Sequence, residues 1–496
     1  MAKLSFNKHS KYFLSIASVL IFALIGSYII FSSKAETALS ADFNSDNTVN
    51  IYDLSIMASN WAKTSVTHAM GDANADLAIN IFDLSLLASQ WGQTITPTPP
   101  TYTIIPTGDD TGTLDATNIQ AAIDSKGTNG GEITFAPGTY TISSPIKLPA
   151  GNLAILILSG NGAIINLVNT TPRFFVWDRT AMHQTFRKFF IEGFNVDAGN
   201  NHPASGSWSV LGFDMKSGSG YYDAGYLNIE EITIKDNHIY NVATSSISTW
   251  NAIDIHVGVS HWGDESTENH INDILVQGCR LEGGERGVNI NGYGNIASAT
   301  NITLDRIFIR DCWHDTGVDP VQFGQSTNYH VGQSGKLGTV EITNSYGARS
   351  FDCGVEVDQA ANGLVQDVTI ENPYYNMFYY TNFNTPLSGA GKTIFNRNTA
   401  RSTIATYGAN GFGVGYEGLG IGDIILTDFK YASSLTGWRT AVNIPDNSII
   451  KSLSINGLNI SAPNTSTTPQ AYIYTGGVIQ SKSISTITVN GSFVNY

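Results

Sequence analysis

The segment "ITIKDNHI", residues 232–239, alternates apolar and polar residues and then reaches a turn at Asp236 and Asn237. Such alternation is typical of a β-strand with one buried face, and Asp and Asn favour turns because their side chains bond to the nearby backbone. Similar segments recur: "FFIEGFNV" (189–196), "ILVQGCRL" (274–281), "IFIRDCWH" (307–314), "VEITNSYG" (340–347), "VTIENPYY" (368–375), "IILTDFKY" (424–431), "LSINGLNI" (453–460) and "ITVNGSFV" (487–494). The recurrence predicts a repeating structure that is mostly β.

The spacing of these segments indicates a coil of parallel strands. Successive copies start at residues 274, 307 and 340, an interval of 33 residues each time (307 − 274 and 340 − 307). Periods of about 20–50 residues mark solenoids, in which each repeat buries its apolar face only against its neighbours. We therefore predict a right-handed parallel β-helix over residues 103–496. A β-sandwich or propeller is the alternative, and the absence of regular hairpin turns disfavours it.

The start of the predicted coil contains a segment suited to cover its open end, which would otherwise expose a bare strand edge. An amphipathic stretch around Ile119, Ala122 and Ile123 precedes a Gly-rich turn and the strand "EITFAPGTYTI". Residues 104–148 resemble the opening of pectate-lyase-superfamily β-helices, in which such a helix caps the coil. The resemblance implies a carbohydrate substrate. It does not choose among the lyases, hydrolases, epimerases and tailspikes of that superfamily.

Composition narrows the partners and the compartment. The chain has 496 residues, 14% of them charged, and a formal net charge of −15, which argues against nucleic acid because its recognition needs a basic surface. Three cysteines are too few for a disulfide framework. Cys279 and Cys312 occupy the same offset on adjacent repeats, so a bridge and two stacked free thiols remain alternatives.

A doubled loop precedes the coil and has the spacing of a calcium site. "DFNSDNTVNIYD" (42–53) returns as "DANADLAINIFD" (72–83), an offset of 30 residues (72 − 42). Oxygen donors fall at loop positions 1, 3, 5, 9 and 12, with a backbone carbonyl available at position 7, which are the EF-hand offsets for the six to eight oxygens that calcium takes. The predicted Ca²⁺ ligands are Asp42, Asn44, Asp46, Thr48, Asn50 and Asp53 in the first loop, and Asp72, Asn74, Asp76, Ala78, Asn80 and Asp83 in the second.

Each loop is followed by a helical pattern, with apolar residues at Leu54, Met57, Ala58 and Trp61 and again at Leu84, Leu87, Ala88 and Trp91. Two loop-helix units in tandem, each loop ending in "DL", resemble a type I dockerin, which we place at residues 40–93. The resemblance implies two bound calcium ions and docking onto a cohesin.

The loops also depart from the dockerin pattern. Position 6, where a glycine is expected, is Asn47 in one loop and Leu77 in the other, so the second site is expected to be weaker. Positions 10 and 11, which in the family read the cohesin and are usually small hydroxyl residues, are Ile51, Tyr52, Ile81 and Phe82. These apolar residues put a standard cohesin partner in doubt.

The remaining segments predict export and a spacer. Residues 1–35 combine Lys3, Lys8 and Lys11 with the apolar run from Phe13 to Phe31, which indicates a signal peptide or an uncleaved membrane anchor. In either case the rest of the chain is expected outside the cell, secreted or at the cell surface. The segment 94–102 contains "TPTPPT" and is predicted to be an extended linker.

A second strand can be aligned in each repeat between residues 250 and 360: "AIDIHV", "GVNING", "GVDPVQF" and "GVEVDQ". If the apolar residues of these strands point into the coil, the polar residues between them form a stripe on its outer surface. Parallel strands lie about 4.8 Å apart, so carboxylates on adjacent or next-adjacent repeats would have the separations at which glycosidases hold their two carboxylates, about 5 Å or about 6.5–9.5 Å. The predicted catalytic residues are Asp254, Asp319, Glu356 and Asp358, and a solvated acidic face is the alternative for each.

The predicted substrate-binding residues are His256, Trp262, Trp313 and Arg286, the tryptophans as stacking platforms for sugar rings. Together these features predict an exported glycosidase that uses paired carboxylates on adjacent repeats and is tethered through its calcium loops. A calcium-dependent polysaccharide lyase or uronate epimerase is one alternative. A non-catalytic carbohydrate-binding surface protein is another.

Overall fold

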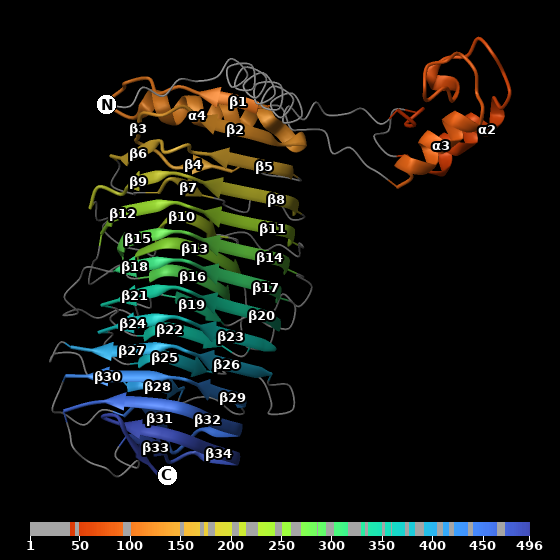
Figure 1. Cartoon of the computed structure of the whole chain (residues 1–496). Coiled ribbons are helices and arrows are strands. Elements are labelled where there is room, and N and C mark those ends of the chain that lie inside the picture. Colours follow the sequence, from red (N-terminus) through yellow and green to blue (C-terminus); the bar gives the residue numbers. More distant parts are fainter. Residues whose placement is uncertain are drawn as a thin grey trace, which may run out of the picture. The chain divides into compact units, whose positions relative to one another are not determined.

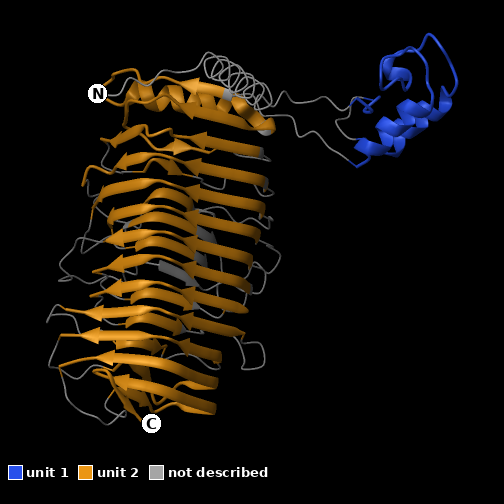
Figure 2. Ribbon diagram, in the orientation of Figure 1, with its two compact units in different colours: residues 1–98 blue, residues 99–496 orange. Residues whose placement is uncertain are grey.

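The structure is a computed structural model, and it describes the following residues: 40–44, 49–92, 101–148, 153–168, 173–176, 184–200, 208–214, 227–243, 250–258, 269–284, 286–293, 302–315, 329–332, 336–349, 353–358, 360–372, 376–381, 391–403, 410–415, 421–434, 440–463 and 472–496. The chain divides into two compact units, Met1–Thr98 and Pro99–Tyr496 (Figure 2). The predicted signal or anchor at 1–35 lies outside the described residues. No helix within the described ranges has the length and apolar character needed to cross a membrane.

The first unit is a pair of loop-helix repeats. It contains α2 (Ile51–Ser59), the short 3-10 helix η1 (His68–Met70) and α3 (Ile81–Gln90). Asn50 and Asn80 cap the two α-helices, each accepting a hydrogen bond from the backbone two residues on, at Tyr52 N (2.8 Å) and Phe82 N (2.8 Å). The unit has its own small core: Ala41, Phe43, Val49, Met57, Val66, Ile79 and Leu87.

The predicted buried stripe of each helix is wrong in part. Met57 and Leu87 are buried, but Ala58 and Ala88 are exposed, and Trp61 and Trp91 keep 45% and 48% of their surface exposed. The reason is length. Helix α2 has 9 residues and α3 has 10, so each tryptophan lies beyond the end of its helix and leaves the apolar face.

The second unit is a coil that visits three rows of strands in turn (Figure 1). Row A contains β1 (Thr101–Ile104), β2 (Gly131–Phe135), β5 (Leu153–Ser159), β8 (Gln184–Glu192), β11 (Leu227–Lys235), β14 (Asn269–Gln277), β17 (Ile302–Arg310), β20 (Lys336–Thr343), β23 (Asn362–Gln366), β26 (Lys392–Asn396), β29 (Ile421–Thr427), β32 (Ile449–Ser461) and β34 (Val478–Val489). Row B contains β3 (Thr139–Ile142), β6 (Ile164–Leu167), β9 (Asn195–Asp197), β12 (His238–Val242), β15 (Arg280–Gly283), β18 (Trp313–Asp315), β21 (Tyr346–Ala348), β24 (Thr369–Glu371), β27 (Thr399–Ser402) and β30 (Lys430–Ser433). Row C contains β4 (Ile146–Lys147), β7 (Phe175–Val176), β10 (Trp208–Asp214), β13 (Trp250–Gly258), β16 (Arg286–Tyr293), β19 (Tyr329–Gly332), β22 (Cys353–Asp358), β25 (Asn376–Thr381), β28 (Asn410–Val414), β31 (Val442–Ile444) and β33 (Ile473–Thr475).

Strands of each row pair in parallel with the next strand of the same row. In the described residues, rows A and B together with β35 form a 24-stranded sheet, and row C forms an 11-stranded sheet. A short antiparallel hairpin, β34 with β35 (Ser492–Val494), ends row A. The mostly β composition and the stacked parallel strands are confirmed, and they are consistent with a β-helix. The coil starts earlier than predicted, because β1 begins at Thr101, inside the segment assigned to the linker.

The turn from row A to row B explains the repeated sequence pattern. Its bend residue has a positive φ in repeat after repeat, as at Asp236 (52°), Asp311 (56°) and Asn344 (49°), and glycine takes this place at Gly278 (65°). This left-handed conformation favours Gly, Asn and Asp. The Asn, Asp or Gly that follows each apolar alternation is therefore the residue that bends the chain into the next row.

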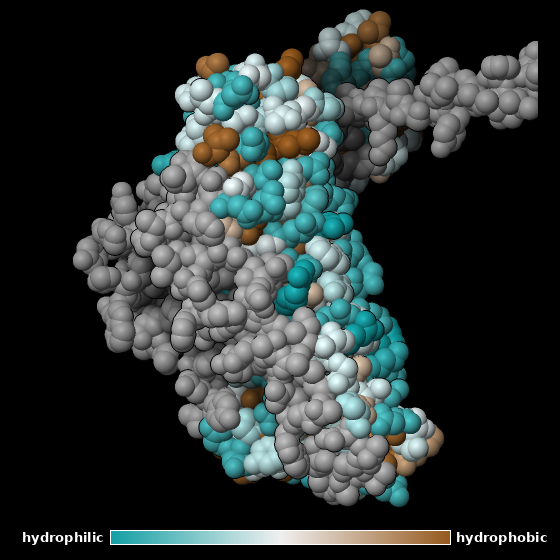
Figure 3. Space-filling model, turned by 90° about the vertical axis from the view of Figure 1, so that its left-hand side faces the viewer, coloured by the Kyte–Doolittle hydropathy of each residue, from teal (hydrophilic) through white to brown (hydrophobic). Residues whose placement is uncertain are grey.

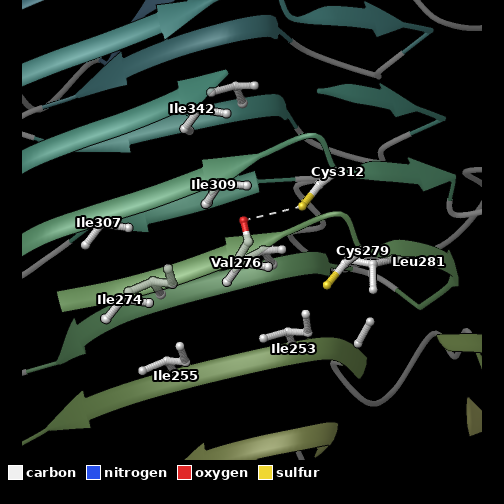
Figure 4. Close-up of a cluster of buried hydrophobic side chains, with 14 of the residues drawn as sticks. Ile253, Ile255, Ile274, Val276, Cys279, Leu281, Ile307, Ile309, Cys312 and Ile342 are labelled. Carbon is white, nitrogen blue, oxygen red and sulfur yellow. Dashed lines mark hydrogen bonds between the residues drawn. The ribbon is translucent and has the colours of Figure 1, made fainter. Parts of the chain in front are cut away.

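The interior of the coil is a continuous column of apolar side chains. Cys279 and Cys312 stack on adjacent turns as buried free thiols, so no bridge joins them (Figure 4). The Cys312 thiol donates to the carbonyl of Val276 (3.7 Å). The contact with the Cys279 thiol, together with burial, raises the pKa of the Cys312 thiol well above its usual value.

The predicted capping helix is present as α4 (Thr113–Lys126). It buries Ala116, Ile119, Ala122 and Ile123 in the core of the coil. A buried carboxylate fixes its position, because Asp115 accepts hydrogen bonds from Thr107 N (2.9 Å) and from Thr141 N (3.0 Å) on β3. The first turn of the coil is thereby covered.

The described surface on the side shown in Figure 3 is mainly hydrophilic, and hydrophobic atoms gather toward the N-terminal end of the coil. Large apolar side chains exposed near that end include Ile105, Leu114, Ile164 and Val168. Most apolar residues of the coil are instead turned toward its core.

Replacing Asn398 by leucine is expected to destabilise the coil by about 2 kcal/mol, since a buried backbone donor left unpaired costs about 1–3 kcal/mol. Asn398 is 0% exposed, and its amide joins two backbone groups: it accepts from Val368 N (3.0 Å) and donates to Val365 O (2.8 Å). Denaturant unfolding of the coil measures the change. Asn396→Ala is the control, because Asn396 is only half-buried and bonds the side chain of Gln366, and it is expected to stay within about 0.5 kcal/mol.

Candidate functional site

One column of outward positions runs along row C. The strand register places in one line Gly212, Asp254, Asn289, His330, Glu356, Tyr379, Gly413 and Asn443. Neighbouring positions on the same strands, such as Ile253, Ile255 and Val355, are fully buried, so alternation puts the column on the outer face. Five consecutive strands, from β13 to β25, thus place polar residues in register, and we call these five positions the row C ladder; the side chain of His330 lies outside the described residues.

The strand predicted between β16 and β22 is wrong. The sequence pattern predicts "GVDPVQF" there, but the strand that pairs with both β16 and β22 is β19, residues Tyr329–Gly332. Asp319, the predicted catalytic residue on that segment, lies outside the described residues. The error has a physical reason, because both "GVDPVQF" and "YHVG" satisfy the apolar alternation, and the register alone distinguishes them.

The prediction of catalytic carboxylates on adjacent repeats depended on Asp319 lying next to Glu356, and in the observed register His330 takes that position. Asp254 and Glu356 are three strands apart, through Asn289 and His330. At about 4.8 Å per strand their positions are about 14 Å apart, beyond the range in which two carboxylates flank one glycosidic bond. Positions 356 and 358 lie on the same face of β22, two residues or about 6.6 Å apart. The side chain of Asp358 is outside the described residues.

Asp254 belongs to a hydrogen-bonded group that includes a cation. Asn289, only 3% exposed, donates from Nδ2 to Asp254 Oδ1 (2.6 Å) and accepts from Arg286 Nη1 at 2.9 Å. Arg286 is paired in register with Asn251 on β13. Two buried atoms, Arg286 Nε and Asn251 Oδ1, have no hydrogen-bond partner within the described part of the chain. Both atoms are covered by the chain, and the polar atoms of this group that bond one another are those of Asp254, Asn289 and Arg286.

The predicted substrate-binding residues do not all lie on row C. Arg286 lies beside the row C ladder, and His256 is on β13, two positions after Asp254, with its side chain outside the described residues. Trp262 lies outside them entirely. Trp313 is on β18 in row B, away from the ladder. Its indole stacks with Tyr346 (5.8 Å between ring centroids) and lies under Arg280 (4.7 Å), and its role as a sugar platform stays a prediction.

Sequence reasoning missed His330 and Tyr379 on the ladder. The available signal was weak, because "YHVG" is a short alternation after a long connection and "MFYY" reads as an apolar run. On rows A and B, by contrast, outward carboxylates pair with cations on the next strand, as Asp273 does with Arg306 (2.5 Å) and Glu341 with Arg310 (3.1 Å). Those acids have a structural role across strands.

The second loop of the first unit is closed by a buried carboxylate. Asp83, 0% exposed, accepts from Ala73 N (2.9 Å) and Asn74 N (3.2 Å) on one oxygen and from Asn80 N (2.8 Å) on the other. Asp72, at position 1, accepts from Leu77 N (2.9 Å). The last residue of the loop therefore holds its first residues in place.

The middle of this loop carries an exposed carboxylate. Asp76 accepts from Asn74 Nδ2 (2.9 Å) and from Ala78 N (2.9 Å), and the first of these bonds contributes most to lowering the pKa of Asp76 below its usual value. The group therefore remains ionised at neutral pH, as a cation ligand must.

The first loop repeats this closure in its described part. Asp53, also 0% exposed, accepts from Phe43 N (2.7 Å) and Asn44 N (3.3 Å) on one oxygen and from Asn50 N (2.9 Å) on the other. Of the predicted ligands, Asp46 and Thr48 lie outside the described residues. The same three contacts in both loops confirm that the repeat is structural as well as sequential.

The donor set fits a calcium ion. Each loop offers carboxylate and amide oxygens and no sulfur or imidazole ligand at the predicted positions, and oxygen alone is what this hard cation prefers. Within the described residues no three acidic, His or Cys side chains form a metal cluster by themselves. The coordination shell of a calcium ion in each loop therefore needs the Asn amide oxygens and a backbone carbonyl besides the carboxylates.

Comparison with known families gives one match, and it falls on this repeat. Residues 40–91 match the family model of the dockerin type I domain. The first unit contains a dockerin domain. Dockerin domains bind calcium and dock onto cohesins, and they indicate an extracellular, cellulosome-associated protein. No curated protein matches the chain.

The dockerin domain presents two matching apolar pairs. Ile51 and Tyr52 begin α2 with 57% and 67% of their surfaces exposed, and Ile81 and Phe82 begin α3 with 58% and 68%. Burial repeats residue by residue along the two helices. The pairs thus form equivalent exposed sites at positions 10 and 11 of the two loops.

Position 6 of the second loop is strained in the way the sequence predicts. Leu77 has φ +66° and its side chain is 61% exposed. A left-handed conformation costs an L-residue about 1–2 kcal/mol, and packing does not compensate an exposed side chain. The strain lies in the loop whose calcium site was expected to be the weaker one.

Leu77→Gly is expected to tighten calcium binding by the second loop about threefold to fivefold, because relief of strain outweighs the entropy cost of glycine by somewhat under about 1 kcal/mol. Calorimetric titration of calcium into the full chain measures this. Leu77→Ala is the matched control, since it removes the apolar side chain but keeps the Cβ. Equal gains in both variants would show that φ is not the cause.

Proposed function

We propose that the coil hydrolyses a polysaccharide along the row C ladder, and that the dockerin domain attaches it to a cohesin when calcium is bound. The observation that carries the proposal is the ladder itself: polar residues in register on five adjacent strands, from Asp254 to Tyr379. A sugar chain laid along the coil meets a new polar position about every 4.8 Å.

Positions 356 and 358 are the proposed catalytic pair. Their spacing of about 6.6 Å lies at the lower end of the range for inverting glycosidases, about 6.5–9.5 Å, in which one carboxylic acid protonates the leaving oxygen and the other carboxylate activates a water. In this assignment Glu356 and Asp358 divide the acid and base roles. Asp254 and Asn289 hold sugar hydroxyls farther along the ladder.

The resemblance of residues 104–148 to pectate-lyase-superfamily coils supports a carbohydrate ligand.

A second reaction, lyase or epimerase chemistry on an acidic polysaccharide, has one specific observation in its favour. Arg286 places a guanidinium beside Asp254 and Asn289, and its buried Nε is unpaired within the described residues. A guanidinium binds a uronate carboxylate well. Hydrolysis is preferred because β22 has two acidic residues, at positions 356 and 358, at a suitable spacing.

For the dockerin domain we propose two calcium sites, one in each loop. When bound, calcium supplies the positive charge around which the loop oxygens gather. The chain's own contribution is to prearrange them, with Asp53 and Asp83 clamping the ends of the loops. We expect the cohesin partner to have an apolar contact surface, because the dockerin domain exposes Ile51, Tyr52, Ile81 and Phe82.

Incubating the full chain with a panel of plant and microbial polysaccharides tests the enzymatic proposal. Hydrolysis predicts new reducing ends without absorbance at about 235 nm, which marks the unsaturated product of a lyase. New reducing ends with that absorbance would support the lyase instead. Binding without any product would support a non-catalytic carbohydrate-binding protein and contradict both reactions.

A further inference from the structure

His68 lies between the two calcium loops of the dockerin domain. It opens η1, and its Nε2 is 3.0 Å from the carbonyl oxygen of Asp42, while its Nδ1 is 3.4 Å from the carbonyl oxygen of Asp72. Asp42 and Asp72 are the first residues of the two loops. One side chain thus contacts equivalent backbone atoms of both sites.

The surroundings hold this ring in place. Phe43 packs edge-on against it, with ring centroids 5.3 Å apart. Gly71 ends η1 at φ +115°, and a Cβ there would lie 2.8 Å from Met57 Cα, so the short helix is pressed against α2. Little freedom remains for His68 to leave either carbonyl without moving the other loop.

Other backbone hydrogen bonds of the loops join them to segments outside the two loops. The carbonyls at position 8, of Val49 and Ile79, accept from Gly92 and Ala62, which follow the helices. They bind each loop to the segment after a helix. His68 contacts the first residue of each loop directly.

We infer that His68 is a positioning residue that couples the two calcium sites, so that filling one loop raises the affinity of the other. Filling the first loop fixes Asp42, and through the imidazole this holds Asp72 in the position its own site requires. Coupling between two binding sites is reciprocal and commonly amounts to about 5–150-fold in affinity. The inference rests on the proposed binding of calcium by both loops.

A four-protein cycle in the full chain tests the coupling. The first loop is disabled by Asn44→Ala with Asp46→Ala, which leaves the Asp42 carbonyl and the buried Asp53 unchanged. The same change is made beside His68→Phe, which keeps a ring against Phe43 but removes both polar contacts. Calorimetric calcium titration then gives the affinity of the second loop in each background. Far-UV circular dichroism in chelator reports whether the fold of the dockerin domain is retained.

With His68 present, disabling the first loop is expected to weaken the second about fivefold or more. In the His68→Phe background the same change is expected to weaken it less than about twofold. Equal losses in the two backgrounds would overturn the coupling while leaving two calcium sites in place. Absence of calcium binding by the unaltered chain would instead contradict the proposed function.

His68→Gln decides the matter if the phenylalanine variant does not fold. Its amide takes the place of Nε2 and can still donate to the carbonyl of Asp42, but it has no atom in the place of Nδ1, so the contact with Asp72 is lost and weaker coupling than with His68 is expected. Coupling equal to that of the unaltered protein would overturn the inference, because the contact with Asp72 would then not be needed.

Discussion

Glu356→Gln is expected to lower polysaccharide hydrolysis about 10²–10⁴-fold, the usual contribution of a general acid or base. The amide keeps the shape of the side chain but can neither give up nor take the proton. Glu356 lies on β22 between Val355 and Val357, which are 0% exposed, so the substitution changes an outward position and leaves the core intact. Initial rates of reducing-end release measure the effect, and unfolding curves check stability.

Glu341→Gln is the matched control for this variant. Glu341 is also an outward glutamate of the coil, but on β20 in row A, where it pairs with Arg310 at 3.1 Å. Losing a partly exposed ion pair costs at most about 1 kcal/mol, and activity is expected to be unchanged. If both variants kept full activity, the row C ladder would lose its catalytic role. A fall in both would place the chemistry elsewhere.

Asp83→Ala is expected to unfold the dockerin domain and to abolish calcium binding by the second loop. Three backbone N–H groups, of Ala73, Asn74 and Asn80, bond this buried carboxylate. Leaving buried donors unpaired costs about 1–3 kcal/mol each, a large fraction of the 5–15 kcal/mol that is typical of a whole domain. The small hydrophobic core of this unit adds little further stability to offset that loss.

Hydrogen exchange of peptides from residues 49–92 in the full chain measures this unfolding, while peptides from the coil serve as an internal reference. Asp76→Ala is the control variant. Asp76 is exposed, and its carboxylate bonds Asn74, Ala78 and Asn80 of its own loop, so its loss is expected to weaken calcium binding without unfolding the calcium-free domain. Protection of 49–92 that survives in Asp83→Ala would contradict the clamp assigned to this carboxylate.

Much of the coil could be predicted because its repeated residues have local causes. Asp236 and Asn344 bend the chain at positive φ, which their short polar side chains tolerate. The apolar residues before them can be buried only by stacking. The loop positions were equally local, and Asp53 and Asp83 lie where the twelve-residue spacing places them.

The candidate site was harder to predict because it depends on register between distant strands. Alternation cannot show whether "GVDPVQF" or "YHVG" pairs with β16, and a wrong choice changes which carboxylates are neighbours. The neighbours of Trp313 could not be predicted for a related reason. The sequence alone does not show that Arg280 and Tyr346 lie next to its ring.

The most direct test of the account is a crystal structure of the Glu356→Gln variant with an oligosaccharide of the substrate found in the polysaccharide panel. The account predicts a sugar chain along row C, in contact with Asp254 and Asn289, with a glycosidic linkage beside positions 356 and 358. A sugar chain bound to row A or row B, with row C empty, would contradict it.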